Sequence, residues 1–312
     1  MKYKQLKLNS LAKKFPFSLK PAPAWRAIIG LFVIIVLCLL IGAAPILILV
    51  FPLGSFAVGV FLYQRYPILY IGFTWWMWFL TPLIRRLIDY KCGYITPFPY
   101  GLAALLVTSI SLMTLVRHFP KIYNRDGLPF TLCIITVFYG FFIGLIQQSI
   151  TDYEREILVL LSWLSPVCFG FHLFINWREY PSLCQNIQRT FFWIVLVTGV
   201  YGVLQFFLAP PWDNFYLASH QLNHLGRPEP LGIRVFSTMG ESVPFAANLM
   251  PGLLLLFISK EKWRFVVAGF GYLAFLLSLA RTPWYTFVIA VLLFVFSLKE
   301  SHQIRILLNC CC

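Results

Sequence analysis

Charged residues are scarce in this chain of 312 residues. Asp, Glu, Lys and Arg together make up 12% of it and only 11 residues are acidic, whereas 60% of the residues are hydrophobic. Soluble domains contain about 45–50% apolar and about 25% charged residues, so the composition excludes an ordinary soluble domain. The apolar stretches are continuous and do not alternate every second residue, which argues against a membrane β-barrel. The sequence therefore predicts an all-α, polytopic helical membrane protein.

Metal-binding and nucleophile motifs are also missing. The eight cysteines form neither a CxxC pair nor a Cys/His spacing typical of zinc sites. His220 and His224 are four residues apart and could share one helical face, but no third ligand stands at a recognised spacing. No G-x-S-x-G motif marks a serine nucleophile. We therefore expect no metal site and no cofactor.

Ten apolar stretches approach the length of about 20 residues that crosses a bilayer. They cover 27–43, 45–63, 67–84, 100–116, 129–148, 157–176, 190–208, 243–258, 265–280 and 282–298. The sequence thus predicts about ten transmembrane helices in one domain, 27–298. A basic tail at 1–26 precedes this domain, a short tail at 299–312 follows it, and an outer loop at 209–242 interrupts it.

The basic residues indicate an orientation. If the N-terminus is cytoplasmic and the spans alternate, 18 of the 25 lysines and arginines lie on the cytoplasmic side and 7 on the outer side. This asymmetry agrees with the positive-inside rule, although Arg85, Arg86 and Lys91 fall on the outer side against it.

The N-terminal lysines lack interleaved stacking aromatics, so we expect no nucleic-acid partner. No charged residue lies well inside an expected span, which disfavours an ion-coupled carrier.

Two phrases near the C-terminus combine an arginine with the start of an apolar stretch. RVFSTMGESVPFA occupies 234–246 and LARTPW occupies 279–284. Ser242 and Thr282 suit the N-cap of a helix, and a proline follows each within the first turn. A helix N-terminus presents unpaired N–H groups and a positive dipole end, which favours anions. Both starts fall on the outer side of the alternating topology.

Arg234 and Arg281 each precede one of these helix starts. A single arginine at a span end commonly extends toward lipid phosphates, and that interpretation stays open for each residue. Together, on one side of the membrane, they favour a shared anion site, because a guanidinium makes forked contacts to phosphate oxygens. Arg227, in GRPEP, is a weaker third member. The sequence predicts a diphosphate-binding site at this surface.

The phrase RVFSTMGESVPFAANLMPGLLL, followed by LLSLARTPW, resembles the O-antigen ligase/polymerase family, particularly its cyanobacterial-type members. The resemblance implies a metal-independent glycosyltransferase of polysaccharide biosynthesis, placed in the bacterial cytoplasmic (inner) membrane. It would move a glycan from a polyprenyl diphosphate to an acceptor hydroxyl at the outer face. The family's two diphosphate-binding arginines match Arg234 and Arg281. The family's Ser-Arg-Gly is Ala280-Arg281-Thr282 here, and the large later loop with its required histidine has no counterpart, which implies a C-terminally truncated chain.

A hydroxyl acceptor needs a base within hydrogen-bond reach to take its proton. The outer candidates are Glu241, Asp213, His220 and His224, and we assign catalysis to Glu241 and His224. Glu241 could instead complement the dipole of the helix that follows it.

Two functions other than glycan transfer stay open at this point. The chain could be a small-anion, bicarbonate-like membrane transporter, or an inactive truncated fragment.

Overall fold

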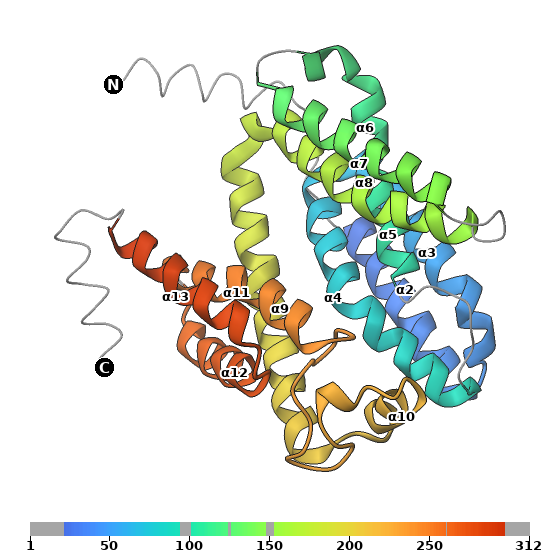
Figure 1. Ribbon diagram of the computed structural model, residues 1–312, viewed down its shortest axis with the longest axis vertical. Helices are drawn as coiled ribbons and strands as arrows, with labels where there is room; N and C mark the ends of the chain where they lie inside the picture. The colour runs from blue at the N-terminus through green and yellow to red at the C-terminus, as the bar shows by residue number, and fades with distance from the viewer. Residues whose placement is uncertain (1–21, 94–100, 124–125, 148–152, 260, 297–312) are drawn as a thin grey trace.

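The structure is a computed structural model that describes residues 22–93, 101–123, 126–147, 153–259 and 261–296. These residues form helices and no β-strand apart from one isolated bridge between Gly226 and Ile233. Six helices are long and apolar enough to cross a membrane (Figure 1). They are α2 (Ala22–Ile41), α3 (Ala44–Arg65), α4 (Pro67–Cys92), α7 (Leu128–Gln147), α8 (Tyr153–Ile175) and α9 (Tyr180–Leu208). The chain is therefore an all-helical, multi-pass membrane protein, as expected.

The other apolar segments are helical but shorter. They are α5 (Leu102–Ser109) with α6 (Leu112–Arg117), α11 (Ser242–Ile258), α12 (Arg264–Leu277) and α13 (Arg281–Phe296), and short 3-10 turns occupy Phe119–Tyr123 and Trp177–Glu179. A helix of 14 residues, such as α12, is about 21 Å long, whereas the bilayer core is about 30 Å thick. The expected count of ten spans is therefore not confirmed.

The tails expected at the two ends are mostly not described. The tail at 299–312 lies outside the described residues, as does 1–21 of the N-terminal tail. Residues 22–26, expected as the end of that tail, instead form the first turn of α2. The first apolar helix thus begins five residues before the expected start at 27.

The surface of α7 shows why the fold needs lipid around it. None of the residues in its apolar stretch Leu128–Ile146 is buried. Leu132, Tyr139 and Phe142, for example, are each more than half exposed. An exposed apolar surface of this extent is unfavourable in water and favourable against lipid tails. This face of α7 is therefore expected to contact the lipid tails of the membrane.

Two apolar cores organise the described helices. The first joins α2, α3, α4 and α5 around Leu62, Met77 and Val107. The second joins α4, α9, α11 and α12 around Ile194 and Leu249. Figure 1 shows α11, α12 and α13 gathered beside the lower half of α9, with α4 on the other side. Since α4 contributes to both cores, it connects the two halves of the molecule.

Glycines allow α9 and α12 to pack backbone to backbone. A Cβ atom added to Gly199, on α9, would lie 2.9 Å from the backbone N of Gly271, on α12. A Cβ on Gly271 would in turn lie 2.5 Å from the side chain of Val195. Small residues at such crossings let membrane helices approach closely and gain dispersion contacts. This crossing fixes α12 against the long helix α9.

Helix α4 continues past the end of the span expected at 67–84. It runs to Cys92, so that Arg85, Arg86 and Asp89 lie inside the helix and are buried. Arg85 Nε is 3.0 Å from Asp89 Oδ1, one turn along. The expected span 67–84 contains no charge, but the helix extends past it and carries these charged residues. Its charges are tolerated because they are paired.

The expected outer loop 209–242 is an ordered cap over the ends of α4 and α9. It contains α10 (Pro211–Ser219) and a 3-10 turn, η5 (Asn223–Leu225). Its apolar side chains form a small core of their own, made by Ala209, Tyr216, Leu217, Leu225, Ile233 and Phe236. In Figure 1 this cap lies at the lower end of the molecule, beside the lower ends of α4 and α9.

Candidate functional site

Residues 234–240 form an irregular segment between the cap and α11. The consecutive side chains from Val235 to Met239 are buried. An unpaired N–H or C=O costs about as much as a lost hydrogen bond when it is buried, so a buried irregular backbone must find partners. The position of the 234–240 segment is therefore set by the groups that bond it.

Gln205, on α9, holds the middle of this segment. Its Oε1 accepts hydrogen bonds from the backbone N–H groups of Phe236, at 3.0 Å, and Ser237, at 2.8 Å. Its Nε2 donates to Asp213 Oδ2 at 2.8 Å. Gln205 is fully buried, and hydrogen bonds in a low-dielectric interior are stronger than those in water. A single amide thus joins α9 to α10 and to the 234–240 segment.

Arg86, on α4, makes a second connection. Its Nη1 donates to Asp213 Oδ1, and its Nη2 donates to the backbone carbonyl of Ser237. The side chains of Arg86 and Asp213 are both completely shielded from solvent. The guanidinium also lies 4.8 Å from the ring centroid of Phe236 and 5.6 Å from that of Tyr216. These contacts compensate for the removal of a full charge from water.

Asp213 is the centre of this network. Besides Arg86 and Gln205, the hydroxyl of Tyr201 donates to its Oδ2 at 2.8 Å, and Trp212 Nε1 donates to that hydroxyl at 2.7 Å. Burial raises the pKa of Asp213 above its ordinary value, while Arg86 opposes that shift. Asp213 is one of the candidate bases, but its carboxylate is fully buried and engaged by three side chains, so it is not free to take a proton from an acceptor.

The segment is also attached to α12. Val235 N donates to the carbonyl of Leu277, near the end of α12, at 3.1 Å. Ser237 has a φ of 50°, in the left-handed region that non-glycine residues rarely adopt, and its Oγ donates to the carbonyl of Thr198 at 2.6 Å. This bond attaches the segment to α9 as well. Three helices thus impose one conformation on the segment.

The hydrogen bond between Val235 N and the carbonyl of Leu277 joins the two chain segments that carry Arg234 and Arg281. Arg234 immediately precedes Val235, and Arg281 follows Leu277 by four residues as the first residue of α13. Both arginines are exposed, whereas the residues around Arg234 are buried. Neither guanidinium has an ion-pair or hydrogen-bond partner among the described residues. Two exposed cations, without partners among the described residues, are thus attached to segments that hydrogen bonds hold in place.

The weaker candidates lie on the exposed surface of the cap. Arg227 is exposed and its Nη1 lies 3.8 Å from Glu229 Oε1, at the edge of ion-pair distance. Glu241 precedes α11 in the N-cap position but makes no side-chain cap bond. His224 lies in η5 and is also exposed. All three lie within ten residues of Arg234 in the sequence.

Three local expectations are wrong in detail. Ser242 is the first residue of α11 and not its N-cap, and α13 begins at Arg281, so Thr282 lies within its first turn. Residue His220 follows the end of α10 and His224 lies in η5, so the two do not share a helical face. Helix boundaries depend on backbone geometry that a cap residue alone does not determine.

Sequence reasoning missed the Arg86–Asp213–Gln205 network. One signal of this network was present in the sequence. Arg85 and Arg86 fall on the expected outer side of the membrane, where the positive-inside rule disfavours basic residues. The structure explains the contradiction, since each of these arginines is paired with an aspartate. A basic pair that violates the topology rule indicates buried acidic partners elsewhere in the chain.

Metal chemistry and known relatives add nothing to this site. Within the described part of the chain, no group of three His, Cys, Asp or Glu residues is arranged to hold a metal ion. The chain matches no family model, and neither the curated proteins nor the solved structures give a match. The site is therefore interpreted from its own chemistry.

Proposed function

We propose that the chain is a membrane glycan transferase of the O-antigen ligase/polymerase type. It moves a glycan from a polyprenyl diphosphate to an acceptor hydroxyl at the outer face of the cytoplasmic membrane. The observation that carries the proposal is the pair of exposed arginines, Arg234 and Arg281, which have no ionic partner among the described residues. Because their segments are joined by the Val235–Leu277 bond, they suit a ligand with two linked phosphates.

In the proposed reaction, the acceptor oxygen attacks the anomeric carbon of the donor sugar. The bond between that carbon and the diphosphate oxygen breaks, and its electron pair stays on the diphosphate. The two guanidiniums stabilise this growing negative charge, and Arg227 adds a third positive charge nearby. Glu241 or His224 takes the proton that the acceptor hydroxyl loses. No metal or cofactor takes part.

The buried network supports the proposal through rigidity. Arg234 protrudes from a segment that Gln205, Arg86 and Leu277 hold at successive residues. A charge on a fixed backbone is already oriented for its ligand, so less free energy is lost in ordering it when the ligand binds. A framework of this kind suits transition-state stabilisation.

A small-anion carrier is less well supported. Carriers place free ionisable groups at membrane depth, along the path of the ion. Arg85 and Arg86, the arginines buried within the described spans, are both paired with aspartates. Arg234 and Arg281 are instead exposed and have no ionic partner among the described residues, so a surface reaction can use them.

Transfer of glycan from a polyprenyl diphosphate in membranes tests the proposal. The Arg234→Ala, Arg281→Ala double variant should lose transfer at equal protein level. Arg26→Ala is the matched control, since it removes an exposed arginine of α2 outside the site. Unchanged transfer by the double variant would exclude the proposed site. Binding of polyprenyl diphosphate alone, measured on the purified protein, separates loss of binding from loss of the chemical step.

A further inference from the structure

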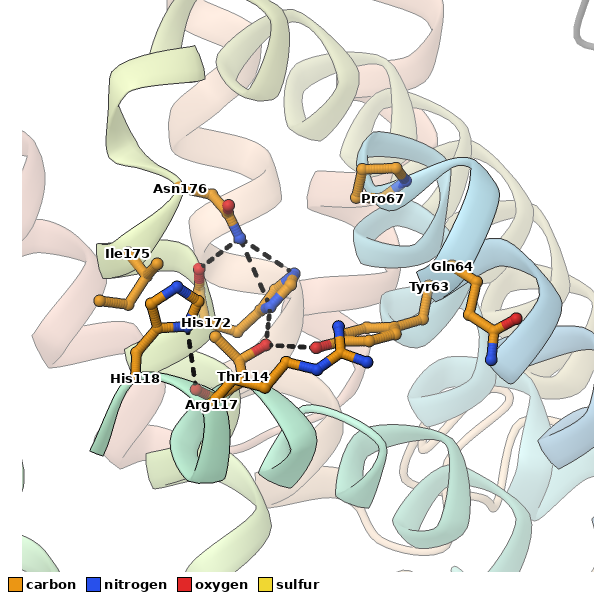
Figure 2. Close-up of a pocket in the computed structure, with 9 residues that line it drawn as sticks. All are labelled: Tyr63, Gln64, Pro67, Thr114, Arg117, His118, His172, Ile175 and Asn176. Atoms are coloured by element: carbon orange, nitrogen blue, oxygen red, sulfur yellow. Dashed lines mark hydrogen bonds between the residues drawn. The ribbon is translucent and has the colours of Figure 1, made fainter. Parts of the chain in front are cut away.

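A second polar site lies far from the arginines, at the opposite end of α4. A cavity of about 420 Å³ is lined by the last turns of α3, α6 and α8 and by the first residue of α4 (Figure 2). Its lining residues are Tyr63, Gln64, Pro67, Thr114, Arg117, His118, His172, Ile175 and Asn176. Pro67 precedes Arg86 by 19 residues on the same helix, or about 28 Å, which is close to the bilayer thickness.

The floor of the cavity is a buried chain of hydrogen bonds. Tyr63 OH lies 2.8 Å from Thr114 Oγ1, and Thr114 Oγ1 lies 2.7 Å from His172 Nδ1. Asn176 Nδ2 donates to the backbone carbonyl of His172 at 2.9 Å. His172 also packs against the rings of Tyr63 and Tyr70 at about van der Waals contact, with centroids 5.5 and 5.6 Å away. These contacts hold the floor rigid before any ligand arrives.

The rim of the cavity is positively charged. Arg117 is exposed and has no ion-pair or hydrogen-bond partner among the described residues, and Figure 2 shows its side chain extending toward Tyr63 and Gln64. His118 Nδ1 donates to the carbonyl of Thr114 at 3.2 Å. Because Nδ1 makes this bond, Nε2 is left to contact a ligand. No lining residue is acidic.

Neighbouring residues place this cavity at the level of lipid headgroups. Trp177 directly follows Asn176 and is 61% exposed, and exposed tryptophans prefer the membrane–water interface. The carboxyl ends of three helices also meet here, and their carbonyls favour hydrogen-bond donors. The best ligand therefore combines a phosphate with a donor group beside it.

We infer that this cavity binds the phosphate group of a phospholipid headgroup such as phosphatidylglycerol. Arg117 and His118 contact the phosphate oxygens, and the hydroxyls of the headgroup face the helix ends and Asn176. Free glycerol phosphate offers similar phosphate and hydroxyl groups from solution, as a monoester without acyl chains. The site is independent of the proposed transferase reaction, because it lies at the other end of α4.

Native mass spectrometry of the full chain, released from nanodiscs of phosphatidylcholine and phosphatidylglycerol, tests the inference. The Arg117→Ala, His118→Ala double variant should retain phosphatidylglycerol about tenfold less, as expected for the loss of charge-assisted hydrogen bonds. Arg65→Ala is the matched control, since Arg65 is exposed at the end of α3 but does not line the cavity. Both altered residues lie on the rim, and a thermal unfolding curve verifies that the double variant is folded.

A second variant separates the cavity from general surface charge. Ile175→Trp fills the cavity and keeps Arg117 and His118, so it should also lose phosphatidylglycerol. Loss in the rim variant with full retention in Ile175→Trp would overturn the inference, because it would indicate attraction to the surface alone. Unchanged phosphatidylglycerol with loss of glycerol phosphate binding in both variants would support the site and assign it a soluble source. Unchanged binding of both ligands would overturn the inference.

Discussion

Arg86, on α4, and Asp213, on α10, form an ion pair from which solvent is completely excluded, although 127 positions separate them in the sequence. The pair joins a membrane helix to the cap that covers its end. Arg86 also donates to the carbonyl of Ser237, so the same guanidinium orients the 234–240 segment. The framework of the proposed site thus depends on a charge outside the site itself.

Replacing one partner of this pair should destabilise the protein strongly. Arg86→Met leaves the buried carboxylate of Asp213 without its cation, a change that costs about 3–5 kcal/mol in buried pairs. The measurement is thermal unfolding of purified protein in detergent. Adding Asp213→Leu should recover part of the loss, because neither charge then remains buried alone. Equal stability of wild type and Arg86→Met would contradict this account.

Gln205→Leu should loosen the 234–240 segment. The substitution keeps the size of the side chain roughly constant but leaves the buried N–H groups of Phe236 and Ser237 without an acceptor. An unsatisfied buried group costs about 1–3 kcal/mol. Hydrogen exchange at residues 235–238 should become faster relative to exchange within α9. Gln221, which is exposed, provides the control as Gln221→Leu.

The crossing of α9 and α12 predicts a contrast between two glycines. Gly271→Ala should destabilise by about 1–3 kcal/mol, because the new methyl group would overlap Val195 and Leu253. Gly269→Ala lies on the same helix with nothing within 4 Å of the added Cβ, so it should be neutral or slightly stabilising. Unfolding of both variants in one detergent tests the contrast. Similar effects of the two substitutions would contradict this account, because the close approach at Gly271 would then make no difference to stability.

Lysine should substitute poorly at the proposed diphosphate site. Arg234→Lys and Arg281→Lys keep the charge but cannot make the forked contact of a guanidinium with two phosphate oxygens. We expect transfer by each lysine variant to lie much closer to the alanine variant than to the wild type. Full activity of both lysine variants would show that charge alone suffices and would remove the argument for forked recognition.

Labelling with a membrane-impermeant maleimide tests the orientation. In a background without accessible cysteines, Asn223→Cys in the cap should react in intact cells, while Lys121→Cys should react only after permeabilisation. Both positions are exposed and they lie on opposite sides in the alternating topology. The reverse pattern would invert the proposed orientation and place the arginines in the cytoplasm.

Hydropathy alone determined the class of this protein. Each apolar stretch predicted from the sequence is helical in the described region, because a chain in lipid must satisfy its backbone hydrogen bonds within each segment. Backbone hydrogen bonding within a helix joins residues close together in the sequence, so each membrane helix can be recognised from its own continuous apolar stretch. The helix starts near Arg234 and Arg281 were predicted to within a few residues for the same reason.

Tertiary structure alone decided which distant residues meet. Nothing in the local pattern pairs Arg86 with Asp213, directs Gln205 to the backbone of residues 236 and 237, or gathers Tyr63, Thr114 and His172 around one cavity. These contacts join residues tens to more than a hundred positions apart, and they depend on how helices rotate and cross. The same physics explains the number of spans, since length in three dimensions, and not apolar composition, decides whether a helix crosses the bilayer.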